Sequence, residues 1–136
     1  LIAAFQRLRS YGGATLPMPV LAASAALWAD EAHVIENQKL YRAKMDLAGR
    51  ILGKHPGFTR PEGGFFLWLD VGDGEVAAKK LWQSTGIRVL PGAYLAMLGA
   101  DGRNPGQPYI RIALVHDLAT TERALSAIAA TLMDKP

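Results

Sequence analysis

The sequence predicts a small α+β domain in which a long helical region precedes a sheet of three or four short strands and a closing helix. Apolar residues recur at helical spacing between positions 17 and 52, and again between positions 120 and 133. Between these regions, short runs rich in aromatic and β-branched residues are separated by glycine and proline. The expected order is α-β-α-β-β-α, with mixed or antiparallel strands.

The helical region begins at Pro17 and Pro19, because proline is tolerated in the first turn of a helix. It ends at Gly53, and we expect a bend around residues 30–38. Charged residues of its second half, Lys44 among them, fall mostly off the apolar stripe.

Residues 65–69 read FFLWL, which is too short for a helix. Apolar side chains on both faces predict a central strand that is covered on both sides. A turn is expected at residues 70–74, followed by a short helix at 76–85 that Gly86 ends.

The second predicted strand, residues 87–90, is cut by proline and glycine. Residues 99–108 are a loop by composition, and the third strand follows at residues 109–115. The closing helix covers residues 120–133 and carries its apolar residues on one face.

Composition limits the possible functions. The 136 residues are 50% hydrophobic and 20% charged, which excludes intrinsic disorder. Zero cysteines exclude disulfide scaffolds and thiol catalysis, and they fit a reducing compartment, so we expect a cytoplasmic protein. The 15 basic and 12 acidic residues are scattered, so no nucleic-acid partner is expected. The uncharged residues 10–29 are interrupted by glycine and proline, so no membrane partner is expected either.

The strand at residues 109–115 holds the polar group of most interest. Alternation places Ile110 and Ile112 on one face and Arg111 on the other, beside the small Ala113. A guanidinium with room beside it suits a carboxylate, which it can bind through two hydrogen bonds. An arginine on an edge strand that simply reaches water is the alternative, and spacing alone leaves both open.

Other chemistry has little support in the sequence. His33, His55 and His116 are far apart and show no metal-ligand spacing, so we expect structural roles and no metal site. No phosphate-binding glycine motif and no serine nucleophile signature is present.

Three segments together resemble one enzyme family. Residues 61–68 read PEGGFFLW, residues 86–92 read GIRVLPG and residues 109–114 read YIRIAL. In this order and at these spacings they resemble the C-terminal third of class I/II aminotransferases, the fold-type-I family that uses pyridoxal phosphate. The resemblance implies that residues 17–136 form the C-terminal small domain and that residues 1–16 lead in from a large domain that this sequence does not contain.

The resemblance also implies site residues. Arg111 would grip the α-carboxylate of an amino acid or 2-oxo acid substrate, and Gly64 would line the site. Thr15 would approach the cofactor phosphate of the neighbouring subunit in a homodimer. None of the lysines stands in the family's cofactor-binding context. We therefore expect no catalytic residue and no bound pyridoxal phosphate in this chain alone.

Within the family, residues 36–37, 40–42, 44 and 90–96 look most like those of bacterial succinyldiaminopimelate aminotransferases of lysine biosynthesis. A free-standing small-molecule-binding or regulatory α+β module is the alternative. Such a module would have no large exposed apolar patch, whereas the first ten residues are rich in apolar side chains. This favours a chain that is part of a larger enzyme.

Overall fold

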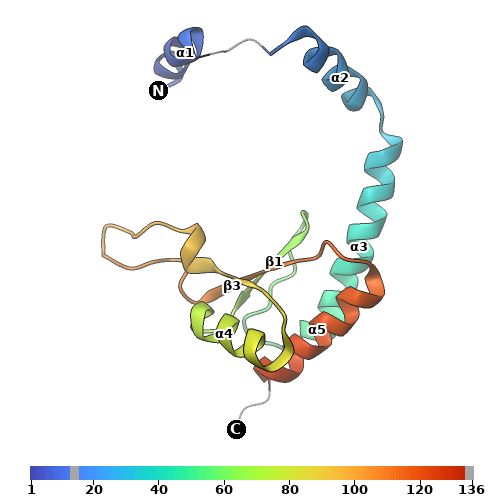
Figure 1. Ribbon diagram of the computed structural model, residues 1–136, viewed down its shortest axis with the longest axis vertical. Helices are drawn as coiled ribbons and strands as arrows, with labels where there is room; N and C mark the ends of the chain where they lie inside the picture. The colour runs from blue at the N-terminus through green and yellow to red at the C-terminus, as the bar shows by residue number, and fades with distance from the viewer. Residues whose placement is uncertain (13–15, 134–136) are drawn as a thin grey trace. The chain divides into compact units, whose positions relative to one another are not determined.

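The computed structural model describes residues 1–12 and 16–133 (Figure 1). The chain divides into two compact units, Leu1–Asn37 and Gln38–Pro136, so that the boundary falls within a helix. The first unit holds α1 (Ile2–Tyr11), α2 (Met18–Ala29) and the first turns of α3 (Ala32–Leu52). Neither α1 nor α2 contains a buried residue.

The predicted bend in the helical region is a break between α2 and α3. Asp30 leaves the helical conformation, and its Oδ1 accepts a hydrogen bond from the Ala32 N–H at 2.9 Å, which starts α3. The helix over residues 2–11 was not predicted from the sequence.

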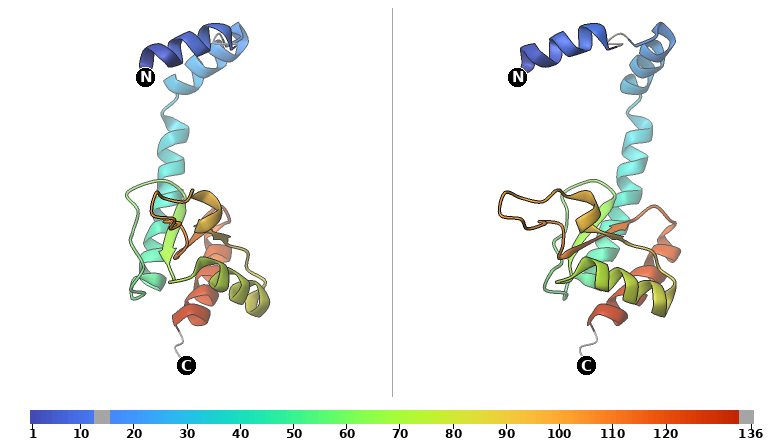
Figure 2. Two further views of the ribbon diagram at one scale, coloured as in Figure 1. Left: turned by 90° about the vertical axis from the view of Figure 1, so that its left-hand side faces the viewer. Right: turned by 60° about the vertical axis from the view of Figure 1, so that its left-hand side comes forward.

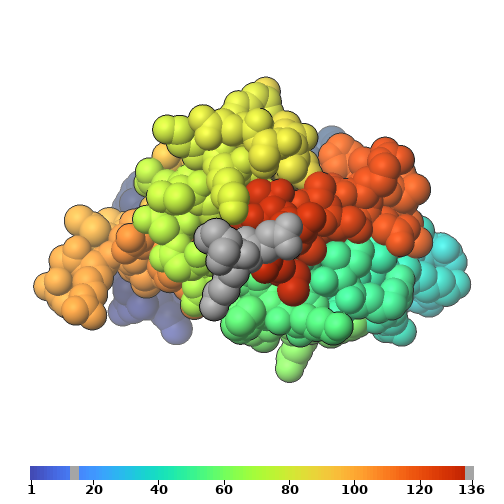
Figure 3. Space-filling view, turned by 90° about the horizontal axis from the view of Figure 1, so that it is seen from below, coloured from blue at the N-terminus to red at the C-terminus, as the bar shows by residue number. Residues whose placement is uncertain are grey.

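The second unit is built on a three-stranded antiparallel sheet in the order β1-β3-β2. Its strands are β1 (Phe66–Asp70), β2 (Leu90–Pro91) and β3 (Tyr109–Ala113). Two helices join the second half of α3 in this unit, α4 (Gly74–Thr85) and α5 (Leu118–Met133), and the 3₁₀ turn η1 spans Gly92–Leu95. In Figures 2 and 3, α5 lies between α4 and the end of α3.

The core lies between one face of the sheet and the three helices. Leu67 and Leu69 of β1 and Ile110 of β3 are fully buried in it. The helices contribute Met45, Leu47, Ala48, Leu52, Ala77, Leu81, Leu125 and Ile128. The opposite face of the sheet carries partly or largely exposed side chains.

The expected α+β class and the order of elements after residue 17 are confirmed, and of the two expected kinds of sheet the antiparallel one is observed, but three details were wrong. The second strand was expected at residues 87–90, whereas β2 shares only Leu90 with that range and includes Pro91. β1 is an edge strand and not a central strand covered on both sides, since Trp68 remains 43% exposed. The apolar run suggested a doubly covered strand because its aromatic side chains are apolar on both faces. In the structure, Trp68 lies on the open face of the sheet. Lys44, expected off the apolar stripe, is buried.

Glycines fix two connections in this unit. Gly86 ends α4 in the left-handed conformation with φ of 72°, as expected for a helix that stops at glycine. A Cβ at Gly74 would collide with the Tyr109 carbonyl oxygen, so α4 can start close against β3. In the part of the chain that the structure describes, no helix has both the length and the apolarity needed to cross a membrane.

Candidate functional site

Arg111 lies in the middle of the open sheet face. Its strand, β3, is the central one, and the register places Trp68 of β1 and Leu90 of β2 on either side of Arg111. Directly paired residues share a face of an antiparallel sheet. The predicted alternation is confirmed, because Ile110 and Ile112 are buried beneath the sheet while Arg111 is only half-buried. The edge-strand position in the alternative was wrong, because β3 is the central strand.

The guanidinium of Arg111 lies over the Phe66 ring. Its Cζ lies 4.3 Å from the centroid of the Phe66 ring. The Nε atom is buried, yet among the described residues it has no hydrogen-bond partner. Buried N–H groups in folded proteins nearly always find an acceptor. A carboxylate fits this need, because its two oxygens match the fork of a guanidinium.

Aromatic side chains surround this position. The Trp68 and Tyr109 rings meet edge to face with centroids 6.0 Å apart, and the Phe65 ring lies 4.1 Å from the Phe66 ring. These rings line the open face of the sheet around Arg111, and Trp68 and Phe65 remain 43% and 40% exposed.

The loop beside Trp68 depends on two glycines in close contact. A Cβ at Gly92 would meet the Gly106 carbonyl oxygen and would lie 2.8 Å from Cζ3 of Trp68. Asn104 ties the same loop, since its Nδ2 donates to the Ala93 carbonyl at 3.0 Å and its Oδ1 accepts from the Gly106 N–H at 2.9 Å. The second residue of the Pro91–Gly92 pair therefore has a steric reason to be glycine.

The other two predicted site residues are Gly64 and Thr15. Gly64 precedes β1 and has a φ of 84°, and a Cβ added there would meet nothing within 4 Å, so its backbone conformation is what calls for glycine. Its role in lining a substrate site stays a prediction. Thr15 lies outside the described residues.

Sequence reasoning missed the structural role of Lys44. The side chain is 9% exposed, and its Nζ donates to the Leu114 carbonyl at 2.9 Å and lies 4.9 Å from the Tyr41 ring centroid. The signal was its spacing, since Lys44 is three residues after Tyr41 and four before Ala48 on one helix stripe. This amine is used to join α3 to the segment that follows β3.

Arg88, the other arginine near the sheet, has a different setting. It is exposed, and its Cζ lies 4.4 Å from the ring centroid of Trp82 in α4. It precedes β2 and so does not belong to the row formed by Trp68, Arg111 and Leu90.

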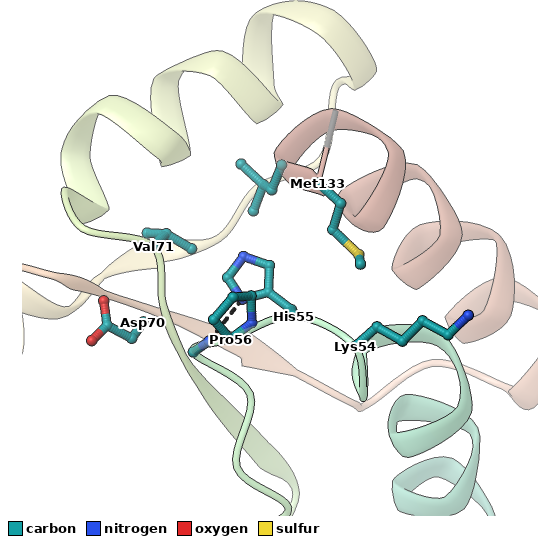
Figure 4. A pocket seen from close by; sticks show the side chains of 8 residues that line it. Lys54, His55, Pro56, Asp70, Val71 and Met133 are labelled. Carbon is teal, nitrogen blue, oxygen red and sulfur yellow. Dashed lines mark hydrogen bonds between the residues drawn. The ribbon is translucent and has the colours of Figure 1, made fainter. Parts of the chain in front are cut away.

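A separate pocket of about 540 Å³ lies where α3, β1 and α5 end (Figure 4). His55 lines it, and its Nδ1 accepts a hydrogen bond from the Gly57 N–H at 3.1 Å. This bond supports the expected structural role of His55 in the turn. Among the described residues, no three histidine, aspartate or glutamate side chains are grouped so that they could hold a metal ion.

Known proteins similar to this chain are aminotransferases. The 4-dedimethylamino-4-oxo-anhydrotetracycline transaminase OxyQ of Streptomyces rimosus is 33% identical over 131 residues, which cover 95% of this chain and 33% of that enzyme. An aminotransferase structure from Neisseria meningitidis matches with a TM-score of 0.83 and 41% identity over 96% of this chain and 34% of its own. The aminotransferase AspB from Helicobacter pylori matches with a TM-score of 0.78 and 32% identity over 98% and 33%.

The chain thus spans about a third of the length of the relatives it matches. No protein-family model matches it. Its fold is that of the C-terminal part of the aminotransferase structures, which confirms the predicted resemblance to a fold-type-I aminotransferase domain.

Proposed function

We propose that this chain is the C-terminal small domain of a pyridoxal-phosphate-dependent aminotransferase, in which Arg111 binds the α-carboxylate of the substrate. The buried Nε of Arg111, which has no acceptor among the described residues, is the observation that carries this proposal. Residues 17–136 would form the small domain, and residues 1–16 would lead in from the large domain. The similarity of the chain to a third of several aminotransferases supports this division.

The cofactor would be held by the rest of such an enzyme. Pyridoxal phosphate supplies the electron sink for amino-group transfer between an amino acid and a 2-oxo acid. Lys44 is buried, and its amine donates to the Leu114 carbonyl and so serves the fold. What this chain contributes is orientation: Arg111 would fix the carboxylate end of the substrate, with Gly64 beside it. Thr15 would approach the cofactor phosphate of a second subunit in a homodimer.

A finer assignment concerns the substrate. The resemblance of residues 36–37, 40–42, 44 and 90–96 to succinyldiaminopimelate aminotransferases supports a cytoplasmic bacterial enzyme of lysine biosynthesis. The relative from Streptomyces rimosus is named for a different acceptor, an oxo-anhydrotetracycline. Both N-succinyldiaminopimelate and this oxo-anhydrotetracycline are therefore substrates to assay.

A chimera provides the test. The C-terminal third of the Neisseria meningitidis aminotransferase is exchanged for this chain, and amino-group transfer from amino acids to 2-oxo acids is measured at steady state. We expect transfer that Arg111→Ala lowers on the order of 10²-fold or more in kcat/KM, because hydrogen bonds between charged groups are lost. Arg111→Lys should recover only part of the loss, since lysine lacks the planar fork.

Arg88→Ala is the matched control, since this arginine is exposed and its guanidinium contacts Trp82 of α4. It should alter substrate choice or change little. A folded chimera that binds the cofactor but transfers amino groups equally well without Arg111 would contradict the proposal. It would mean that another residue holds the α-carboxylate. A folded chimera that binds the cofactor but transfers no amino groups would favour the alternative of a free-standing binding module.

A further inference from the structure

We infer that Phe66 is the positioning residue of the carboxylate site: its ring holds the guanidinium of Arg111 so that the fork faces an incoming carboxylate. This inference rests on the proposed function and deepens it. Nothing in the likeness to other aminotransferases assigns a role to Phe66. The inference comes from the contacts of Arg111 itself.

The Phe66 ring is the one partner that the described residues give to the guanidinium. Cζ of Arg111 lies 4.3 Å from the ring centroid, while Nε has no hydrogen-bond acceptor. No carboxylate among the described residues forms an ion pair with Arg111 either. A long arginine side chain without such a contact would be free to change rotamer.

The strand register explains how the ring reaches Arg111. Phe66 of β1 pairs with Ala113 of β3, and Arg111 is two residues along β3 on the same face. Diagonal neighbours of this kind are within reach of aromatic and long side chains. The small Ala113 leaves the space into which the Phe66 ring can lean toward Arg111. A bulky residue at this position would occupy it.

Further aromatic rings hold Phe66 in turn. Its ring lies 4.1 Å from that of Phe65, and the Phe65 ring lies 5.8 Å from that of Tyr41 in α3. The row Tyr41–Phe65–Phe66 therefore connects Arg111 to α3, whose Lys44 is itself bonded to the end of β3. The guanidinium is supported by the packed second unit and not by a mobile loop.

Stacking and carboxylate binding use different parts of the guanidinium. An aromatic ring contacts its face, whereas a carboxylate accepts hydrogen bonds from the N–H groups at its edge. Phe66 consequently does not compete with the substrate. It keeps the fork oriented before binding, so that less side-chain entropy is lost when the carboxylate arrives.

The experiment uses the full 136-residue chain and the nitrogen NMR signal of the Arg111 Nε–H, assigned with Arg111→Lys. Potassium propionate is titrated in, with potassium chloride at equal ionic strength as the anion control. In the wild-type chain we expect an upfield ring-current shift of this signal and a response to propionate only. Phe66→Leu should abolish the ring-current shift and weaken propionate binding about fivefold, which corresponds to about 1 kcal/mol.

Two variants separate positioning from a merely structural role. Phe66→Tyr keeps an aromatic face and should keep both the shift and the affinity. Phe65→Leu makes the same chemical change at the next residue, whose ring touches Phe66 but not Arg111, and should cost clearly less than Phe66→Leu. If Phe66→Leu binds propionate as tightly as the wild-type chain, the inference is wrong while the proposed function stands.

A different result would count against the proposed function. If the wild-type Arg111 signal shows the ring-current shift but does not respond to propionate, then Arg111 is not a carboxylate site and both proposals fall. Should Phe66→Leu not fold, the nuclear Overhauser contact between the Phe66 ring and the Arg111 side chain decides in the wild-type chain. Its presence, with propionate binding, supports the inference, and its absence overturns it.

Discussion

The two units of the chain differ in how far their apolar side chains are buried. In the unit Gln38–Pro136, leucine and isoleucine side chains from the sheet and three helices are fully buried. In the unit Leu1–Asn37, α1 and α2 contain no buried residue at all. Large exposed apolar side chains of this unit include Leu1, Ile2, Phe5, Leu8, Tyr11, Leu16, Met18, Val20, Leu21, Leu27 and Trp28.

The starts of α1 and α2 differ from those of the other helices, among which α3 begins in the first unit with a cap from Asp30. Neither α1 nor α2 has a side-chain cap at its first turn, whereas Asp73 caps α4 and Asp117 caps α5. Isolated short helices are marginal in water, and tertiary packing supplies most of their stability. The second unit therefore carries its own source of stability, while the first unit consists of helices that require burial by something else. Such apolar surfaces are typical of interaction sites.

The largest difference in unfolding free energy is expected between two matched leucine substitutions, one in each unit. Leu67→Ala removes a fully buried side chain from β1 and should cost about 2–5 kcal/mol of unfolding free energy, because it leaves a cavity. Leu8→Ala makes the same change in exposed α1 and should change the free energy by less than about 0.5 kcal/mol. Urea unfolding of the full chain, followed by circular dichroism, measures both.

If Leu67→Ala and Leu8→Ala lowered the unfolding free energy equally, the contrast in burial between the two units would be wrong. That result would mean that α1 is packed against a partner in solution, and the concentration dependence of the unfolding midpoint would then reveal a second copy of the chain.

Within the second unit, two glycine substitutions compare a closely packed position with an open one. Gly92→Ala would push a Cβ against the Gly106 carbonyl and the Trp68 ring, so we expect a loss of about 1–3 kcal/mol from overpacking. Gly63→Ala is the control, because a Cβ there meets nothing within 4 Å and the backbone is not left-handed. Thermal unfolding of the two variants should differ clearly. Equal midpoints would show that the loop beside Trp68 is not part of the folded unit.

The fold class could be predicted from the sequence because apolar residues recur at helical spacing over long segments, and because glycine and proline mark the boundaries between elements. The closing helix was expected at residues 120–133 and runs from Leu118 to Met133. The alternation around Arg111 was also sufficient to place it on the face opposite the core. That face became a candidate site only through the resemblance, since spacing alone could not tell a central strand from an edge strand.

The predictions for β1 and Lys44 were wrong because the surroundings of these residues depend on parts of the chain that are distant in sequence. The sequence of β1 predicts a strand that is covered on both faces. In the structure, the Phe66 and Trp68 side chains of β1 lie on the open face of the sheet around Arg111. The burial of Lys44 depends on the Leu114 carbonyl, 70 residues away along the chain. No local pattern could predict that Phe66, and not an acidic side chain, is the neighbour of the guanidinium.

The helix caps provide a smaller and more local effect. Oδ1 of Asp73 accepts hydrogen bonds from the N–H groups of Glu75 and Val76, at 3.1 and 3.0 Å. Asp73→Ala should cost about 1 kcal/mol of unfolding free energy, because two N–H groups at the start of α4 lose their acceptor. Asp73→Asn should retain most of the stability. If Asp73→Ala unfolds with the wild-type midpoint in urea, α4 does not depend on this cap.

The smallest effect concerns pH, and it compares one carboxylate from each unit. Hydrogen bonding from the Thr120 N–H at the start of α5 lowers the pKa of Asp117 below its ordinary value of 3.8, and the His33 side chain with the Ala32 N–H lowers the pKa of Asp30. A carboxyl group whose pKa is lowered by folding adds stability above its unfolded pKa, and this stability is lost as the pH falls through the folded pKa. For Asp117 this stability belongs to α5, which is part of the core, so Asp117→Asn should slightly lower the urea midpoint at neutral pH and leave it unchanged well below pH 3.8. Asp30→Asn acts on a helix start outside the core and should leave the midpoint unchanged at both pH values. A midpoint that responds to Asp30→Asn as strongly as to Asp117→Asn would show that the first unit unfolds together with the core.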